Sequence, residues 1–312
     1  TVTLKVKFSD FRQLTRSRTL PSYIRDFNTL HREITSIRKS LDLVNVKIEI
    51  LDILDKVSRS FQKSFEQLNF LIAEPYKEYN TISDYLRKWY AAQALQELLF
   101  YRDLIPNYAN QEILKIILSR SARSARLTTH FDLDFPKQPQ TEPYWCYKHS
   151  RTCKPTTNAY QFLRRYSLDT IHRLEDHARV QTNTKVEIHH ADSRYATIPP
   201  IDGVLTSPPY VGLIDYHEQH RYAYELLGLI DRQAEEIGAA IKGSSQKAKA
   251  DYQLAITQVF NRVLDSMVSG SPIIVVAGDK YDLYEKIGID CNVNVEAILN
   301  RHVNRRTGRR TT

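Results

Sequence analysis

The stretch Gly203-Val204-Leu205-Thr206-Ser207-Pro208-Pro209-Tyr210 decides how this chain of 312 residues is interpreted. Its first residues form a short apolar run of the kind found in buried strands, and two prolines follow almost directly. Each proline fixes φ near about −65°, has no N–H, and pushes the residue before it toward extended geometry. The sequence therefore predicts a strand that ends in a stiff corner carrying a serine and an aromatic ring.

Such a corner suits chemistry on a planar amine. The Ser207 hydroxyl and the Pro208 carbonyl are acceptors that can hold both hydrogens of one incoming NH2 group. Acceptors on both hydrogens favour a pyramidal nitrogen with a free lone pair, so a reaction at this nitrogen needs positioning more than a strong base. Tyr210 offers a stacking face for a base taken out of a duplex. A double-proline turn that merely ends a buried strand is the alternative.

Ser207-Pro208-Pro209-Tyr210 after a strand resembles the catalytic motif of the DNA amino-methyltransferases, which move a methyl group from S-adenosylmethionine to the exocyclic nitrogen of cytosine or adenine. Residues 211–222 continue the similarity, which extends from about residue 80 to the C-terminus. Serine in first place resembles the cytosine branch more than the adenine branch. The resemblance implies a site-specific enzyme of a restriction-modification system that acts on double-stranded DNA, with catalytic roles for Ser207, Pro208, Pro209 and Tyr210.

The resemblance also implies S-adenosylmethionine as the cofactor, with contacts from Asp192, Ser193 and Thr206. A helix N-cap explains Asp192 and Ser193 equally well. The family binds this cofactor with a glycine-rich turn, but all nine glycines lie at or beyond Gly203, and Ala277-Gly278-Asp279 is the only later strand end with a glycine. We therefore expect a second polypeptide or a missing segment to supply the cofactor half. A non-catalytic DNA-binding or decayed fragment of such an enzyme is the alternative.

The charge balance favours a polyanionic partner. The formal net charge is +8 and the isoelectric point is about 9.2. Two arginine clusters are candidates for phosphate contact. One comprises Arg120, Arg123 and Arg126, for which a solvent-facing helix stripe is the alternative. The other comprises Arg301, Arg305 and Arg306, with Arg309 and Arg310 beyond, for which a frayed tail is the alternative. Asp215, His217 and His220, just past the motif, either line a base pocket or cap and coat the helix that follows.

The N-terminal stretch has a different character. Val2, Leu4, Val6 and Phe8 alternate with polar residues, which predicts a half-buried strand. Residues 1–20 resemble the little-finger domain of Y-family DNA polymerases, and we interpret them as a remnant or a fusion junction. Because the chain opens on Thr1 and its only methionine is Met267, we expect a fragment or an incomplete reading.

Strands that alternate with helices predict an α/β fold, with a partial Rossmann-like methyltransferase sheet preceded by a mainly helical region. The expected divisions are a strand remnant at 1–25, a helical region at 26–130, a linker at 131–157 and a catalytic domain at 158–312. The expected strands are Val186–His190, a strand ending at Thr206, Ile273–Ala277 and Val293–Leu299. The expected helices include Ser83–Leu104, Gln111–Arg126, Tyr160–Ala178, Tyr216–Ile237 and Lys247–Met267.

No run approaches the 18 or so apolar residues that a membrane helix needs, and no secretory signal is recognisable, so we expect a cytoplasmic protein. Cys146, His149 and Cys153 form a Cys-x2-His-x3-Cys pattern that offers three zinc ligands. Structural zinc sites usually have four, and His130 is the only nearby candidate for the fourth. The default interpretation is reduced, unpaired thiols with no metal.

Overall fold

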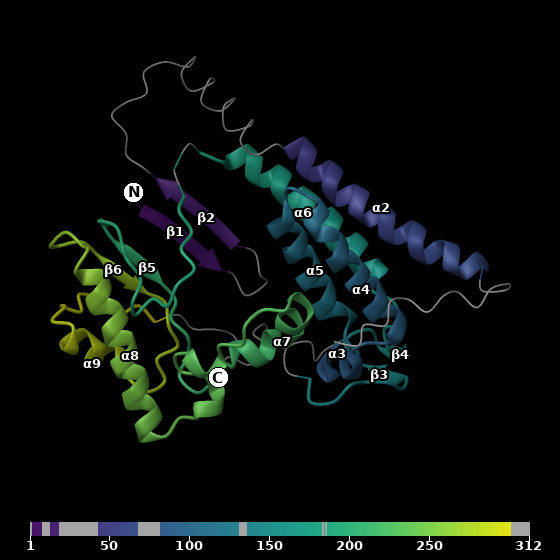
Figure 1. Ribbon diagram of the computed structural model, residues 1–312. Helices are drawn as coiled ribbons and strands as arrows, with labels where there is room; N and C mark the ends of the chain where they lie inside the picture. Colours follow the sequence, from purple (N-terminus) through teal and green to yellow (C-terminus); the bar gives the residue numbers. More distant parts are fainter. Residues whose placement is uncertain are drawn as a thin grey trace, which may run out of the picture. The chain divides into compact units, whose positions relative to one another are not determined.

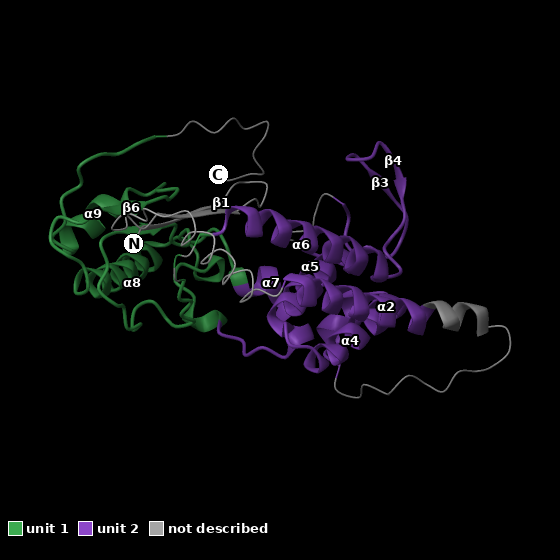
Figure 2. Cartoon of the chain, turned by 90° about the horizontal axis from the view of Figure 1, so that it is seen from above, with its two compact units in different colours: residues 1–30, 182–216, 233–312 green, residues 31–181, 217–232 purple. Residues whose placement is uncertain are grey.

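The computed structural model describes residues 2–7, 13–18, 43–67, 82–130, 136–182, 184 and 186–300. The chain divides into two compact units, one of residues 1–30, 182–216 and 233–312 and the other of residues 31–181 and 217–232 (Figure 2). The domain boundaries expected from the sequence stay a prediction. None of the described helices combines the length and the apolar character that a membrane-spanning segment needs.

The second unit is mainly helical (Figure 1). Its helices are α2 (Leu43–Gln67), α3 (Asp84–Trp89), α4 (Ala92–Leu104), α5 (Gln111–Ala125), α6 (Tyr160–Val180) and all but the first residue of α7 (Tyr216–Leu227). Their buried faces share one core that includes Ile50, Ile53, Leu98, Leu118 and Leu163. A small antiparallel hairpin of β3 (Tyr144–Cys146) and β4 (Arg151–Cys153) lies between α5 and α6 in the sequence.

The helix expected over Ser83–Leu104 is divided into α3 and α4. Ser83 caps α3 as expected, since its Oγ accepts a hydrogen bond from the Leu86 N–H at 3.3 Å. The helix breaks at Tyr90, whose backbone is extended. Here the Trp89 carbonyl accepts a hydrogen bond from the Leu127 N–H at 2.7 Å. The backbone thus bonds to a distant segment at this point in place of continuing the helix.

The first unit combines helices with two pairs of strands. β1 (Val2–Lys7) pairs antiparallel with β2 (Gln13–Arg18), so the expected N-terminal strand is present. β5 (Val204–Thr206) pairs in parallel with β6 (Ile273–Val275), and α8 (Gln246–Leu264) lies between them in the sequence. α8 packs on α9 (Leu283–Asp290) through a core of Tyr252, Ile256, Phe260, Leu283, Ile287 and Cys291.

The mixture of helices and strands agrees with the α/β class, whereas the Rossmann-like sheet stays a prediction. Two expected strands, Val186–His190 and Val293–Leu299, are wrong, because these residues have no strand geometry. Ile188 is 92% exposed and Leu299 is 93% exposed, so both runs lie in solvent without a neighbouring strand to satisfy their backbone groups. The helix expected over Tyr216–Ile237 ends early, at Leu227, because Gly228 adopts a left-handed φ of 63°.

Candidate active site at the end of strand β5

The motif leaves the sheet at the carboxyl end of a parallel strand. Thr206 closes β5 opposite Val275 of β6, and its carbonyl accepts a hydrogen bond from the Val276 N–H at 2.9 Å. Ser207 therefore follows directly on the last paired residue. In α/β sheets ligands bind at this edge, because the strand ends and the loops after them meet there.

The residues of the motif differ in exposure. Ser207 is exposed, Pro208 is buried, and Pro209 and Tyr210 are half-buried. Within the described part of the chain, neither the Ser207 hydroxyl nor the Pro208 carbonyl takes part in a hydrogen bond. The Tyr210 ring lies beside Gly278, where an added Cβ would be 3.7 Å from a ring carbon. The corner thus presents an unengaged hydroxyl next to an aromatic ring.

Two tyrosines, one on α8 and one on α9, fix the corner at Pro209 by a chain of hydrogen bonds. Tyr252 of α8 donates its phenol proton to the Pro209 carbonyl at 2.7 Å, and its oxygen lies 2.7 Å from that of Tyr284 on α9. Because a phenol has one proton, Tyr284 must be the donor to Tyr252. Burial raises the pKa of both phenols, so they remain neutral donors at neutral pH. Neither residue is recognisable from the sequence, since aromatics at helical spacing ordinarily indicate core.

The loop after the motif is tied to residues 236–243. The Gly212 N–H donates to the Gly238 carbonyl at 2.9 Å, and the Ala240 N–H donates to the Ile214 carbonyl at 3.1 Å. Both glycines have left-handed backbones, with φ of 65° and 70°. A Cβ on Gly238 would lie 2.8 Å from the Tyr252 ring, so only glycine fits between the loop and α8.

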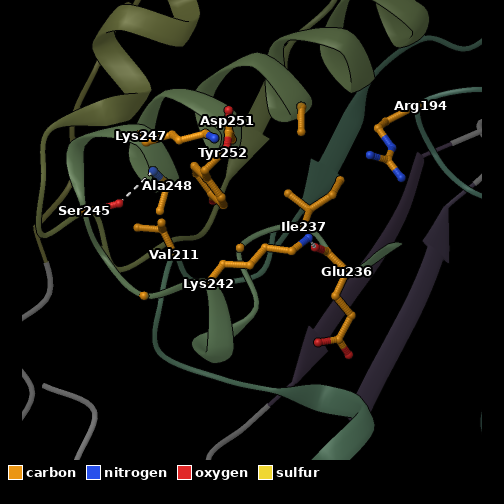
Figure 3. Close-up of a pocket in the computed structure, with 13 residues that line it drawn as sticks. Arg194, Val211, Glu236, Ile237, Lys242, Ser245, Lys247, Ala248, Asp251 and Tyr252 are labelled. Atoms are coloured by element: carbon orange, nitrogen blue, oxygen red, sulfur yellow. Dashed lines mark hydrogen bonds between the residues drawn. The ribbon is translucent and has the colours of Figure 1, made fainter. Parts of the chain in front are cut away.

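A cavity of about 360 Å³ opens beside this loop (Figure 3). Its wall combines Val211 and Tyr252 with charged side chains, among them Arg194, Glu236, Lys242, Lys247 and Asp251. The Ser245 hydroxyl, also on the wall, caps α8 by accepting the Ala248 N–H at 3.2 Å. Ligand pockets measure about 300–1,000 Å³, so the cavity has room for a small ligand. Ser207 and Tyr210 are not part of its lining.

Asp192 and Ser193, two of the expected cofactor contacts, lie in a turn and not at the start of a helix. Asp192 accepts hydrogen bonds from the Arg194 backbone N–H at 3.0 Å and from its guanidinium at 2.5–3.1 Å. These bonds lower the pKa of the Asp192 carboxyl. Residues 192–195 form a turn, so the helix N-cap considered as the alternative is wrong, and Asp192 instead orients Arg194 at the cavity. Ser193 is exposed beside it.

The strand-end glycine after β6 does not form a cofactor loop. Gly278 faces the Tyr210 ring, and the Asp279 carboxylate accepts the Leu283 and Tyr284 N–H groups, both at 2.9 Å. Asp279 thus caps the start of α9. A glycine-rich cradle for S-adenosylmethionine is not formed by the described residues, and these residues do not fit the cofactor in the manner that the resemblance implies.

The polar residues past the motif have partners of their own. The Asp215 carboxylate accepts the side-chain amide of Gln233 at 2.7 Å. The His217 Nε2 accepts the Arg232 N–H at 3.1 Å, and its ring lies 4.5 Å from that of Tyr224. His220 is exposed on α7, with its ring 6.1 Å from that of Tyr222. For Asp215 and His217 these contacts support the structural alternative.

The arginines of α5 are held within the helical unit. The Arg120 guanidinium lies 2.5 Å from the Asp169 carboxylate, 3.2 Å from the Thr170 hydroxyl and 4.4 Å from the Tyr166 ring centre. Arg126 is 2% exposed and stacks over the Tyr222 ring at 4.7 Å. This burial gives Arg126 a packing role in place of the expected phosphate contact. Arg123 is half-buried, and Arg301, Arg305 and Arg306 lie outside the described residues.

Comparison with known proteins agrees with two of the resemblances. Residues 1–64 match the model of the impB/mucB/samB family C-terminal domain, which supports the resemblance to Y-family polymerases. The Type II methyltransferase M.MjaII of Methanocaldococcus jannaschii is 36% identical over an alignment of 255 residues that covers 75% of this chain and 48% of the relative. The chain thus spans about half the length of this curated relative. No solved structure matches the chain significantly. The chain is therefore a homologue of a Type II methyltransferase, and the homology covers 75% of its length.

Proposed function

We propose that this chain is the catalytic half of a site-specific DNA methyltransferase, which moves a methyl group from S-adenosylmethionine to the exocyclic amine of cytosine in double-stranded DNA. The observation that carries the proposal is the position of Ser207-Pro208-Pro209-Tyr210 directly after β5, with an exposed and unengaged serine hydroxyl. Homology to a Type II methyltransferase supports it. Adenine is the second choice of target, and a cytoplasmic location is part of the proposal.

The proposed role of Ser207 and Pro208 is to hold the amine. The hydroxyl and the Pro208 carbonyl each accept one hydrogen of the NH2 group, which turns the nitrogen lone pair away from the base ring. The proline geometry and the hydrogen bond from Tyr252 to Pro209 fix these acceptors before the base arrives. The rate gain then comes from orientation, because no group of the motif is a strong base.

The proposed role of Tyr210 is to stack on the extrahelical base. Its half-buried ring is backed by Gly278, so one side is supported by backbone. Stacking of this kind contributes about 1–3 kcal/mol per base, which offsets part of the cost of unpairing. The ring therefore selects the flipped base, while Ser207 and Pro208 recognise its amine.

We propose that a second segment or polypeptide supplies the cofactor half. Strand β6 leaves apolar side chains exposed to solvent. Ile274 of β6 is 53% exposed, and Val276 just beyond the strand is 58% exposed. Parallel sheets are normally covered on both faces, so a layer is lacking among the described residues. Asp192, Ser193 and Thr206 remain our candidates for the cofactor side of this chain.

The DNA itself would be held by positive charge. The net charge of +8 supports association with a polyanion. We assign phosphate contacts to Arg301, Arg305 and Arg306, with Arg123 as a further candidate. Arg120 is bound to Asp169, and its use on DNA would require that ion pair to open.

Nucleoside analysis of methylated DNA tests the proposal. Unmethylated DNA is incubated with the chain, the segment or polypeptide that supplies the cofactor half, and labelled S-adenosylmethionine, then digested and analysed by mass spectrometry. We expect N4-methylcytosine with the wild type and none with Ser207→Ala. A methyl group on carbon 5 of cytosine would refute the role given to the amine acceptors.

Calorimetry with S-adenosylmethionine separates the enzyme from the non-catalytic alternative. No heat at high cofactor concentration would exclude methyl transfer by this chain alone. If DNA binding persisted in that case, the chain would act as a DNA-binding fragment of such an enzyme, as the missing glycine-rich cradle would also favour.

A further inference from the structure

Four metal-ligating side chains converge at the β3–β4 hairpin of the helical unit. The ligand atoms of His130, Cys146, His149 and Cys153 all lie within 4.8 Å of one another. The Cys146 sulfur is 3.5 Å from Nδ1 of His130 and 3.5 Å from Nδ1 of His149, and the Cys153 sulfur is also 3.5 Å from His149 Nδ1. His130 thus supplies the fourth ligand that the sequence pattern lacked.

The three sulfur-to-nitrogen separations match three of the six edges of a zinc tetrahedron. With Zn–S of about 2.3 Å, Zn–N of about 2.0–2.1 Å and tetrahedral angles, the sulfur-to-nitrogen distance is about 3.6 Å. The three sulfur-to-nitrogen contacts of the cluster are each 3.5 Å. Along these three edges an ion at the centre would meet its ligands with little movement of the side chains, and the other pairs of ligand atoms lie within 4.8 Å of one another.

The fold sets this geometry through the backbone. In the hairpin register Cys146 pairs with Arg151 and Cys153 pairs with Tyr144, which places both sulfurs on one face. His149 occupies the turn between them, where its N–H donates to the Cys146 carbonyl at 3.1 Å and the next residue, Ser150, has a φ of 48°. The turn brings the His149 ring back over the strand that carries Cys146.

His130 comes from a different segment and is held against the same face. Its N–H donates to the Tyr144 hydroxyl at 3.0 Å, and the two rings lie 5.8 Å apart. Its ring also meets that of His149 edge to face, with centres 4.7 Å apart. An ion at this point would tie the end of the α5 segment to the hairpin.

The hairpin has little else to stabilise it. Each strand has three residues, and isolated two-stranded hairpins are marginal in water. Trp145 is 53% exposed and Tyr147 is 79% exposed, so its large side chains are not packed in a core. Only Cys146 and Cys153 of the cluster are buried, and both are free thiols. Small elements of this kind are commonly stabilised by a metal or a disulfide.

We propose that His130, Cys146, His149 and Cys153 bind one structural Zn²⁺ ion. All four tetrahedral positions are filled by protein, which is typical of structural sites, whereas catalytic sites keep one position for water. Two thiolates balance the two positive charges of the ion, so the occupied site is neutral. A tetrahedral set of two sulfurs and two nitrogens selects zinc over the harder divalent cations.

Metal analysis of matched cysteine variants tests the site. The full chain is purified under reducing conditions and its metal content is measured by mass spectrometry. We expect about one zinc per chain in the wild type and less than about a tenth of that in Cys146→Ser. Cys291→Ser is the control, because Cys291 is buried in the other unit and contacts the Thr257 carbonyl. Zinc loss in both variants, or no zinc in any, would overturn the proposal.

Cobalt substitution gives a readout that does not depend on the folding of a variant. The wild type is stripped with a chelator and titrated with Co²⁺, whose visible absorption is strong in tetrahedral sites with thiolate ligands. We expect saturation at about one ion per chain, reversal by one equivalent of zinc, and release of thiol protons on binding. A spectrum of octahedral cobalt would contradict the site.

Discussion

The phenol oxygen of Tyr252 lies 2.7 Å from the carbonyl oxygen of Pro209, the second proline of the proposed catalytic corner. Tyr284 completes the chain of donors from α9, with 2.7 Å between the two phenols. The two prolines of the corner have no N–H groups that could fix it to the protein. The hydrogen bond to the Pro209 carbonyl therefore connects the motif to the packed core of α8 and α9.

Removal of the Tyr252 hydroxyl should loosen this unit. In Tyr252→Phe the Pro209 carbonyl and the Tyr284 hydroxyl both lose a partner, and a buried polar group left without one costs about 1–3 kcal/mol. We expect faster hydrogen exchange in residues 246–264 and in the motif, measured by mass spectrometry. Tyr195→Phe, at a tyrosine that is 73% exposed, is the control and should leave exchange unchanged. Equal protection in both variants would show that the bond is not needed.

Glycine at position 212 should be required by close packing as well as by its backbone angle. A Cβ there would lie 2.5 Å from the Gly243 carbonyl oxygen, with φ at 65°. Gly270 has a φ of 84° but nothing within 4 Å of its added Cβ, so Gly270→Ala isolates the backbone term, about 1–2 kcal/mol. We expect Gly212→Ala to lower the free energy of unfolding by more than this control. Similar losses in the two variants would contradict the packing argument.

The corner itself could be predicted from the sequence, because two prolines after an apolar run have few possible conformations. Its supports could not. Tyr252 and Tyr284 come from helices 43 or more residues further along the chain, as the Pro209–Tyr252 separation shows, and their spacing is that of ordinary core aromatics. The environment of Arg126 is hidden from the sequence for a related reason: its place in the arginine stripe predicts a phosphate contact, with a solvent-facing helix as the alternative, but the Tyr222 ring covers this guanidinium.

Alkaline pH should destabilise the unit that contains α8 and α9. Burial raises the pKa of Tyr252 and Tyr284, so the folded state keeps these phenol protons to higher pH than the unfolded state does. The corresponding stability is complete below the ordinary phenol pKa of about 10 and is lost as the pH rises above it. Urea unfolding followed by circular dichroism should show a shallower alkaline decline in the Tyr252→Phe, Tyr284→Phe double variant. An unchanged slope would show that these phenols do not titrate on unfolding.

The buried carboxylate of Glu97 should be essential to the helical unit. It is 1% exposed and accepts the N–H groups of Ala159 and Tyr160 at the start of α6, at 2.5 and 2.7 Å, and the Gln93 amide at 2.9 Å. Glu97→Ala leaves these donors unpaired, and we expect a loss of about 2–3 kcal/mol in urea unfolding followed by tryptophan fluorescence. Glu97→Gln keeps one acceptor oxygen and should lose less.

Glu112→Ala is the matched control for Glu97. Glu112 is on α5 of the same unit, and its exposed carboxylate pairs with Lys115 three residues away, at 2.7 Å. Exposed pairs contribute about 0–1 kcal/mol, so the unfolding midpoint should hardly move. A comparable loss in the two alanine variants would contradict the capping role of Glu97.

Segments that bury one face in a core were easier to predict from the sequence than segments that lie in solvent. α5, α6 and α8 follow their apolar periodicity closely, because each buries one face in a core. The runs Val186–His190 and Val293–Leu299 also have strand-like sequences, but strand geometry needs a neighbour for the backbone, and Ile188 and Leu299 lie in solvent. The sequence pattern of a segment indicates its preference for strand geometry, but it does not indicate whether a neighbouring strand is present to pair with it.

The stacking role that we propose for Tyr210 can be tested on DNA without knowledge of the recognition sequence. A duplex with a single bulged cytosine has already lost the pairing that base flipping must break, so a protein that binds an extrahelical base should prefer it to a fully paired duplex. We expect the wild type and Tyr210→Phe to share this preference, since phenylalanine keeps the ring. Tyr210→Ala should lower affinity for the bulged duplex by about tenfold, as expected for about 1–3 kcal/mol of stacking, with little change for the paired duplex. If the alanine variant kept the full preference, the Tyr210 ring would not be the surface on which the base stacks. Another residue would then have to position the base so that its amine reaches the unengaged Ser207 hydroxyl.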